Sequence, residues 1–193
     1  MKKYFFIAIL LCSAFISINA QNVSGGCYRG YTDAGYTFGI DDYEFGRFEI
    51  NTSHGYQITP VFYIGAGTGL HFMSLYETKG SSDIPLDIRD SKVDIPVFAN
   101  ARINFTKDKF TPFIDVKGGK FLTNNGGLYT NVSIGCRIAT NEKQAINISI
   151  GYTNEKLEFQ TFSKFNSAQD MSYTREATLR DAEGISLKVG YEL

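Results

Sequence analysis

Histidine and serine are the residues of this chain that come nearest to a catalytic arrangement. The chain has 193 residues and two histidines, His54 and His71. A histidine next to a serine can activate it as a nucleophile, and His71 with Ser74 is the nearest such pair in the sequence. The alternative is an interior His71 that is hydrogen-bonded to its neighbours. We favour this alternative and expect no catalytic residue and no enzyme activity.

Motifs for metal, phosphate or disulfide chemistry are also weak. Cys27 and Cys136 match no zinc spacing, and we expect no disulfide between them. Asp41 and Asp42 sit together, and a solvated turn accounts for them. Residues 65–69 place glycine at every second position but lack the spacing of a phosphate-binding loop, so we interpret these glycines as packing positions. We therefore expect no metal and no cofactor.

The first twenty residues have the parts of an export signal. Two lysines precede an apolar run, and Ala20 is a small residue suited to cleavage. We predict a cleaved signal peptide at residues 1–20 and one domain at residues 21–193. A membrane anchor helix is an alternative, but the run is shorter than the ~20 apolar residues that a spanning helix needs. A lipoprotein anchored through Cys12 is another, although the residue before a lipidated cysteine is usually small and Leu11 is not.

Composition excludes several classes of protein. Hydrophobic residues make up 43% of the chain, which is too many for a disordered protein. The 16 Phe, 12 Tyr and 19 Gly are unlike a coiled coil or a helical bundle. The formal net charge of −1 gives no basic surface for a nucleic acid, so we expect no nucleic acid partner.

Beyond residue 20 the pattern repeats every two residues, which is the period of a β-strand. Eight segments alternate in this way: 28–38, 47–58, 62–72, 93–104, 114–117, 128–138, 146–153 and 185–193. Three connections are short, at 59–60, 106–109 and 140–143, and four are longer, at 39–46, 76–91, 121–126 and 154–183. Short turns at one rim and longer loops at the other are typical of an outer-membrane barrel. Closing such a meander removes its unpaired edges.

The face that points inward decides between a soluble sandwich and a membrane barrel. Segments of about ten residues suit tilted spanning strands, and the polar face mixes charges with glycine and tyrosine as a crowded interior would. An unpaired charge is costly in such an interior, so the near balance of charges predicts a paired network. Its predicted members are Arg29, Asp33, Arg47, Glu49, Asp94, Arg102, Asp115, Lys117, Arg137, Lys188 and Glu192. We predict a filled barrel, because eight strands leave just enough room for side chains. The alternative is a solvated sandwich face.

Several stretches resemble the small outer-membrane β-barrel domain family, the OmpA/OmpX-like eight-stranded barrels, and give the chain the look of a porin-family protein. These stretches are residues 18–21, 28–31, 55–60, 63–67, 95–99, 151–152 and 187–193. The resemblance covers essentially the whole mature chain. It implies an all-β fold, an eight-stranded antiparallel up-and-down transmembrane β-barrel.

The last strand looks like the signal that the outer-membrane assembly machinery recognises in this family. Apolar residues occupy every second position, at Leu187, Val189, Tyr191 and Leu193. The family usually ends in an aromatic residue, and Leu193 departs from that pattern. The resemblance therefore implies the assembly machinery as a partner during biogenesis and outer-membrane lipid as the lasting one.

The longest predicted loop, 154–183, contains Phe159, Phe162, Phe165 and Tyr173. Exposed aromatic residues on a loop are candidate contact points for a partner. The interpretation we favour is that the last two strands extend past the membrane and place these aromatic residues in its interfacial girdle.

Together these features predict a non-enzymatic, monomeric barrel in the outer membrane of a bacterium, with a structural or surface-interaction role. The residues identify no surface ligand. Three alternatives stay open: a narrow solute pore, a lipid-modifying barrel enzyme, and a soluble periplasmic β-sandwich or lipocalin-like binder.

Overall fold

The computed structural model describes residues 26–40, 46–77, 86–106, 108–123, 127–141, 144–167 and 170–193, with the backbone alone for residues 86, 162–167 and 170–175. The predicted signal peptide, residues 1–20, lies outside these ranges. Within them, no helix is long and apolar enough to cross a membrane.

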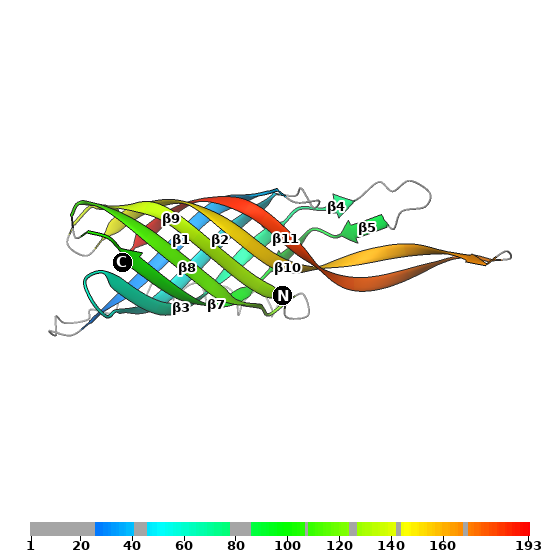
Figure 1. The fold of residues 1–193 in the computed structure, drawn as a ribbon, viewed down its shortest axis with the longest axis horizontal. Coiled ribbons are helices and arrows are strands. Elements are labelled where there is room, and N and C mark those ends of the chain that lie inside the picture. The colour runs from blue at the N-terminus through cyan, green and yellow to red at the C-terminus, as the bar shows by residue number, and fades with distance from the viewer. Residues whose placement is uncertain are drawn as a thin grey trace, which may run out of the picture.

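Eight strands form a closed antiparallel barrel (Figure 1). Each strand pairs with the next along the chain, and β1 also pairs with β11, so the sheet closes on itself. The predicted fold class is therefore confirmed. The eight strands are β1 (Cys27–Gly39), β2 (Arg47–Gln57), β3 (Phe62–Met73), β7 (Pro96–Asn104), β8 (Phe110–Phe121), β9 (Leu128–Ala139), β10 (Ala145–Ser167) and β11 (Asp170–Glu192).

Three short strands lie near the rim opposite the short turns. β6 (Lys92–Asp94) pairs with β3 and precedes β7, from which Ile95 separates it. Pro96 follows that break as the first residue of β7, a position where a strand tolerates its missing N–H. β4 (Tyr76–Glu77) and β5 (Leu86–Arg89) pair with each other, and β5 also pairs with β10. The longer connection predicted over 76–91 thus contains two short strands, β4 and β5.

β8 is longer than its sequence pattern predicts. The alternation is clear only over 114–117, whereas the strand runs from Phe110 to Phe121. Pro112 and the Gly118–Gly119 pair interrupt the apolar pattern without ending the strand. Its neighbours β7 and β9 supply backbone partners on both sides along most of its length, and this pairing outweighs the weak local preference.

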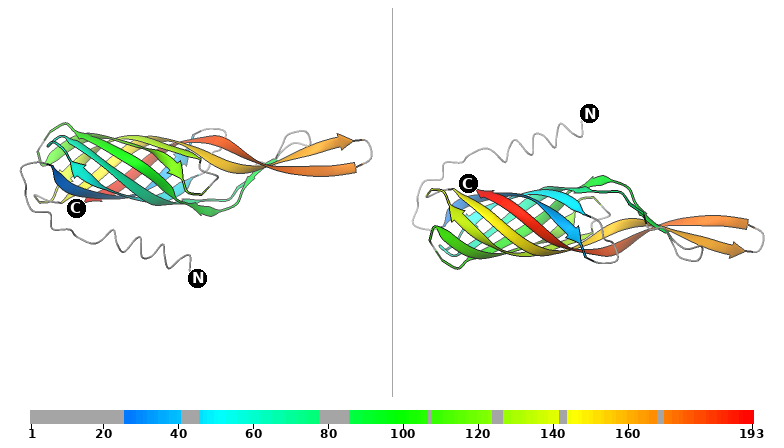
Figure 2. Two further views of the ribbon diagram at one scale, coloured as in Figure 1. Left: turned by 90° about the horizontal axis from the view of Figure 1, so that it is seen from below. Right: turned by 90° about the horizontal axis from the view of Figure 1, so that it is seen from above.

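β10 and β11 run far beyond the barrel as a two-stranded ribbon (Figures 1 and 2). Each has 23 residues, about twice the ~9–11 residues that a tilted spanning strand needs. Their pairing is continuous from Ala145–Glu192 to Ser167–Asp170. The prediction of a loop over 154–183 is therefore wrong, and the interpretation in which both strands extend past the barrel is confirmed.

The barrel wall has the orientation that the alternation predicts, with apolar residues outward and polar residues inward. Ile134, Ile148 and Val189 are 59%, 52% and 58% exposed, although they belong to central parts of their strands. Arg47, Glu49 and Lys117 are almost completely buried. A soluble sandwich would have the opposite arrangement, so the structure favours a wall that faces lipid.

Exposed aromatic residues flank the aliphatic part of this wall on both sides. Near the rim that carries the longer connections, Tyr36, Phe48 and Phe72 are cross-strand neighbours. Near the opposite rim, Tyr56 and Phe110 are exposed. Phe48 and Tyr56 are eight residues apart on β2, about 26 Å along the strand at 3.3 Å per residue, which a strand tilt of about 35–45° reduces to roughly 20 Å along the barrel axis. Two aromatic girdles around an apolar band about 25 Å tall are a feature of transmembrane barrels.

Ile148→Arg tests which face meets lipid. The side chain lies between the two girdles, so a charge there should lower the free energy of unfolding by about 2–4 kcal/mol. The measurement is denaturant unfolding of the barrel in lipid vesicles, with Ile148→Leu as the matched control. An unfolding midpoint equal to that of the control would show that this face does not contact lipid.

Candidate functional site: the charged barrel interior

All eleven charged residues predicted for the interior have an oppositely charged partner within 4.0 Å. Eight are buried and three, Arg29, Asp33 and Arg137, are partly buried. Their positions follow from strand periodicity, because inward side chains alternate with outward ones along every strand. The ion pairs form three groups along the barrel axis: one near the short-turn rim, one central, and one near the ribbon.

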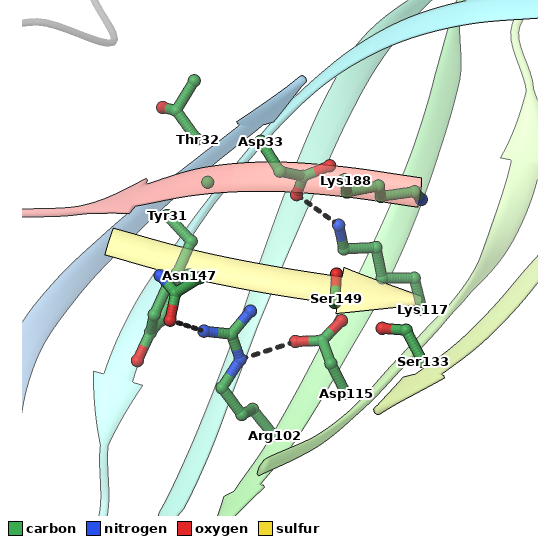
Figure 3. A pocket seen from close by; sticks show the side chains of 11 residues that line it. Tyr31, Thr32, Asp33, Arg102, Asp115, Lys117, Ser133, Asn147, Ser149 and Lys188 are labelled. Carbon is green, nitrogen blue, oxygen red and sulfur yellow. Dashed lines mark hydrogen bonds and ion pairs between the residues drawn. The ribbon is translucent and has the colours of Figure 1, made fainter. Parts of the chain in front are cut away.

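Arg102 is the centre of the middle group. It lies directly opposite Asp115 on the neighbouring strand, and its Nε donates to the Asp115 carboxylate at 2.8 Å. Its guanidinium carbon lies 4.0 Å from the ring centre of Tyr31 and 4.2 Å from that of Phe113. Asn147 accepts a further hydrogen bond at 3.4 Å (Figure 3). Arg102 is thus held by an ion pair, an amide and two aromatic faces.

Lys117 and Asp33 form a bridge across the barrel at the same level. The Lys117 ammonium donates to the Asp33 carboxylate at 2.5 Å (Figure 3). Lys117 is on β8 and Asp33 on β1, and three strands of the wall lie between these two in either direction. The cavity beside this bridge has a volume of only about 10 Å³, which is room for about one water molecule. The charged side chains therefore fill the bore at this level.

Glu192 organises the group near the short-turn rim. Arg137 donates to both of its carboxylate oxygens, at 2.6 and 3.1 Å, and Arg29 lies at 3.3 Å. Because Glu192 is the last residue of β11, these contacts join the end of the chain to β1 and β9. This geometry connects the closing seam of the barrel to the interior network.

His71 lies in the third group, between two carboxylates. Its Nε2 is 3.3 Å from Glu49 and its Nδ1 is 3.2 Å from Glu155. Arg47 lies 3.1 Å from Glu155, and Lys188 lies 3.2 Å from Glu49. All five side chains are nearly or completely buried. The interpretation of His71 as an interior, hydrogen-bonded residue matches this placement.

Glu155 and Arg89 belong to the interior network but were missed by the sequence analysis. Continuing the alternation of β10 past Thr153 would have placed Glu155 on the inward face. Arg89 has no such signal, because it lies on the short strand β5. It pairs with Asp94 and donates to the Glu158 carbonyl at 2.8 Å. Burial lowers the pKa of the Arg89 guanidinium, and the charge of Asp94 opposes this shift.

An apolar cluster closes the barrel on the ribbon side of these charges. Its buried members are Met73, Phe98, Phe121, Tyr129, Leu157, Phe159 and Ala182. Phe159 is completely buried and packs against Tyr76 at 5.8 Å between ring centres. Its predicted place in an outward girdle is therefore wrong, because position 159 falls on the inward face of β10. The side chains of Phe162, Phe165 and Tyr173 lie outside the described part of the structure.

The three glycines of residues 65–69 make room for interior side chains, as the sequence analysis expects of packing positions. A Cβ at Gly65 would lie 2.2 Å from the Tyr63 hydroxyl, and one at Gly67 would lie 2.7 Å from the Phe98 ring. A Cβ at Gly69 would lie 2.1 Å from the Asn51 amide oxygen. Larger residues at these positions would displace the side chains that fill the bore.

The candidate catalytic pair is not assembled in the fold. His71 is completely buried, whereas Ser74 is exposed and donates to the Gly46 carbonyl at 3.2 Å. His54 lies on the outer face, where its Nδ1 is 2.6 Å from the Tyr28 hydroxyl and its Nε2 is 3.1 Å from Thr52. These contacts fit a histidine in the interfacial region.

The other candidate sites are distributed as follows. Cys27 is an exposed free thiol and Cys136 a partly buried one. Asp41 and Asp42 lie outside the described residues. Across the described ranges, no three His, Cys, Asp or Glu side chains form a group that could hold a metal ion. The predicted assembly-signal residues, Leu187, Val189, Tyr191 and Leu193, are all exposed on the outer wall.

Comparison with known proteins bears on the fold alone. No protein-family model matches this chain, and no curated protein sequence matches it. The crystal structure of Neisserial surface protein A (NspA) is similar with a TM-score of 0.55 and 13% identity, over 88% of this chain and 99% of that one. The outer membrane protein OprG from Pseudomonas aeruginosa matches with a TM-score of 0.47 and 11% identity, over 88% and 97%. The outer membrane enzyme PagL matches with a TM-score of 0.44 and 11% identity, over 84% and 97%. The likeness to NspA supports the small barrel fold.

Asp115→Asn tests whether the barrel depends on its interior pairs. The substitution leaves the Arg102 charge buried without its main partner, so the free energy of unfolding should fall by about 3–5 kcal/mol. The control is Lys156→Gln, which removes an ion pair that is 3.8 Å long and about half exposed. That control should change stability by less than about 1 kcal/mol. Equal effects in denaturant unfolding would contradict the proposed dependence.

Proposed function

We propose that the protein is a non-enzymatic barrel of the bacterial outer membrane, with a closed interior and a β-ribbon displayed beyond the membrane. The observation that carries this proposal is the combination of a bore filled by ion pairs with a wall that is apolar outside and bounded by two aromatic girdles. A wall of this kind is stable in lipid, and a bore of this kind transmits little.

The contacts across the bore argue against a solute pore. Lys117–Asp33 and His71–Glu155 each join strands that lie opposite each other in the ring of eight. Opening a path would require both contacts to break in a site with little water to replace them. The apolar cluster around Phe121 and Leu157 adds a second obstruction toward the ribbon.

The location in an outer membrane is supported by the sequence and by the wall together. A chain with an export signal at residues 1–20 would reach the periplasm. Leu187, Val189 and Tyr191 are exposed on the outer face of the last strand. The resemblance implies that the outer-membrane assembly machinery recognises a last strand with this pattern. Lipid is the lasting partner of this wall.

The ribbon gives the protein a surface to display outside the membrane. β10 and β11 extend well past Tyr152, an exposed aromatic residue of the outer wall, and β4 and β5 lie at the same end of the barrel (Figures 1 and 2). In outer-membrane barrels the longer connections are extracellular. The role we propose is therefore a structural or surface-interaction role carried by this ribbon.

Electrophoresis and conductance test the closed membrane barrel together. The purified protein in detergent should migrate differently before and after heating, because a folded barrel resists unfolding by detergent. In planar bilayers it should give no current above baseline. Recovery of the folded protein from cells without detergent would overturn the membrane barrel, and stepwise currents would overturn the closed interior.

Lipid analysis tests the absence of enzyme activity. Cells that express the protein should have the same lipid profile as cells that express His71→Ala and as cells with an empty vector. A lipid species that appears only with the unaltered protein would overturn the non-enzymatic role. The heat-dependent shift of each sample shows that the barrel is folded in the cells compared.

A further inference from the structure

His71 is a buried titratable side chain that the proposed function does not use. It lies on the inward face of β3 and is completely buried. Its ring reaches Glu49 on β2 at 3.3 Å and Glu155 on β10 at 3.2 Å. Because β3 and β10 lie opposite each other in the ring of eight strands, this side chain spans the bore. The number of hydrogens on the ring therefore decides whether the span is an ion pair.

The Nε2 atom of His71 has to be a hydrogen-bond donor. Its contacts in the described part of the chain are the Asn51 amide oxygen at 3.1 Å and the Glu49 carboxylate at 3.3 Å. The network assigns the orientation of the Asn51 amide, because its nitrogen donates to Glu49 at 3.0 Å and to Asp33 at 3.2 Å. The amide oxygen is left to accept from the ring. Nε2 therefore carries a hydrogen.

The Nδ1 atom faces a carboxylate as well. Glu155 lies 3.2 Å from it, which is the distance of an ion pair, although the contact lacks the alignment of a hydrogen bond. Within the described ranges no N–H or O–H group donates to Nδ1, and the hydroxyl of the neighbouring Tyr129 makes no hydrogen bond. A bare Nδ1 would direct its lone pair toward a negatively charged oxygen. A hydrogen on Nδ1 turns this repulsion into attraction.

Both carboxylates have cations of their own, which leaves the ring as the place for the proton. Lys188 lies 3.2 Å from Glu49, and Arg47 lies 3.1 Å from Glu155. A nearby cation favours the charged form of a carboxyl group, so neither glutamate is suited to take the proton instead. With a charged His71 the five side chains form a chain of alternating sign, in the order Lys188, Glu49, His71, Glu155 and Arg47.

Aromatic rings cover this chain of charges on the side of the ribbon. The ring centres of Phe121 and Tyr129 lie 5.7 and 5.3 Å from that of His71, both in a T-shaped arrangement. The five charged side chains are nearly or completely buried. Little water can reach a lone pair here, so the neighbouring protein groups determine which atoms carry hydrogen.

We propose that His71 is a proton-binding site, which in the folded barrel carries a hydrogen on both ring nitrogens and clamps β10 to β2 and β3 across the bore. The site exists because folding brings two carboxylates to the two edges of one imidazole. The inference goes beyond the proposed function, since it makes the strength of the closed interior depend on pH. Loss of the proton would leave Glu49 and Glu155 without their shared cation, next to the apolar cluster that contains Leu157.

Nuclear magnetic resonance of the histidine ring nitrogens tests the proton directly. The full chain is refolded in detergent micelles with isotope-labelled histidine, and His54→Gln identifies the His71 signals. At about pH 8, where a histidine in an unfolded chain is mostly neutral, both ring nitrogens of His71 should carry hydrogen. A His71 ring with one bare nitrogen would overturn the proposal.

His54 in the unaltered chain is the internal control for this measurement. Its ring nitrogens face the hydroxyls of Tyr28 and Thr52, which can each donate or accept a hydrogen bond. A neutral ring satisfies both contacts, so His54 should show one protonated and one bare nitrogen under the same conditions. Two protonated nitrogens on both histidines would show that the sample conditions, and not the two carboxylates, hold the proton, and would overturn the proposal.

The pH dependence of unfolding tests whether the proton is taken up on folding. At about pH 8 the unfolded chain has released this proton and the folded barrel keeps it, so rising pH favours unfolding. Relative to His71→Gln, the unfolding equilibrium constant of the unaltered protein should rise about tenfold per pH unit in this range, as expected for one proton. His54→Gln should behave like the unaltered protein. Equal pH dependence of His71→Gln and the unaltered protein would contradict the proton site.

The heat-dependent shift in detergent gels keeps these results separate from a failure of the barrel itself. If His71→Gln does not fold, the resonance measurement on the His54→Gln chain decides the question alone. A barrel that keeps its shift and shows a neutral His71 would reject the proton site while leaving the proposed function intact. An unaltered protein without the shift would overturn the proposed function and this inference with it.

Discussion

The pairing of charge inside a closed β-wall is the constraint on which the rest of the structure depends. An ion without a partner is costly where little water can reach it. The bore meets this requirement through ion pairs such as Arg102–Asp115 and Lys117–Asp33. The ring of Tyr31 also packs against the Arg102 guanidinium. Glycines on β3 provide the space for Tyr63, Phe98 and Asn51 in the same interior. The filled interior, the apolar exterior and the even spacing of polar residues all follow from the same alternation.

The molecule has two regions with different physical bases of stability. Within the membrane, every strand has two neighbours and the wall has no free edge. Beyond it, β10 and β11 have mainly each other, with brief support from β5. Leu157 and Phe159 join the two regions, because they turn inward and pack on residues of the barrel mouth. The ribbon, to which the proposed surface-interaction role belongs, is thus the part of the sheet with the fewest paired neighbours.

The sequence predicts the wall well because a period of two is a local signal that survives in nearly every strand. The same period assigns the eleven charged residues to one face of their strands, because successive side chains of a strand point to opposite faces. It fails where pairing with neighbours overrides local pattern, as in β8 around Pro112. It misses Arg89 because a short strand docked on β10 leaves no periodic trace. The alternation also predicts an inward Glu155, but the sequence analysis ended that strand at residue 153 and so left Glu155 out.

The bridge between Lys117 and Asp33 has a consequence for how the barrel comes into being. Its two ends belong to strands that lie opposite each other in the ring, so a flat, open sheet cannot form it. Until the sheet curves and brings β1 across from β8, neither charge has this partner, and an unpaired charge is costly to place in hydrocarbon. Curvature of the sheet and neutralisation of its interior charges are therefore linked, and the curved wall is better suited to hydrocarbon than a flat one.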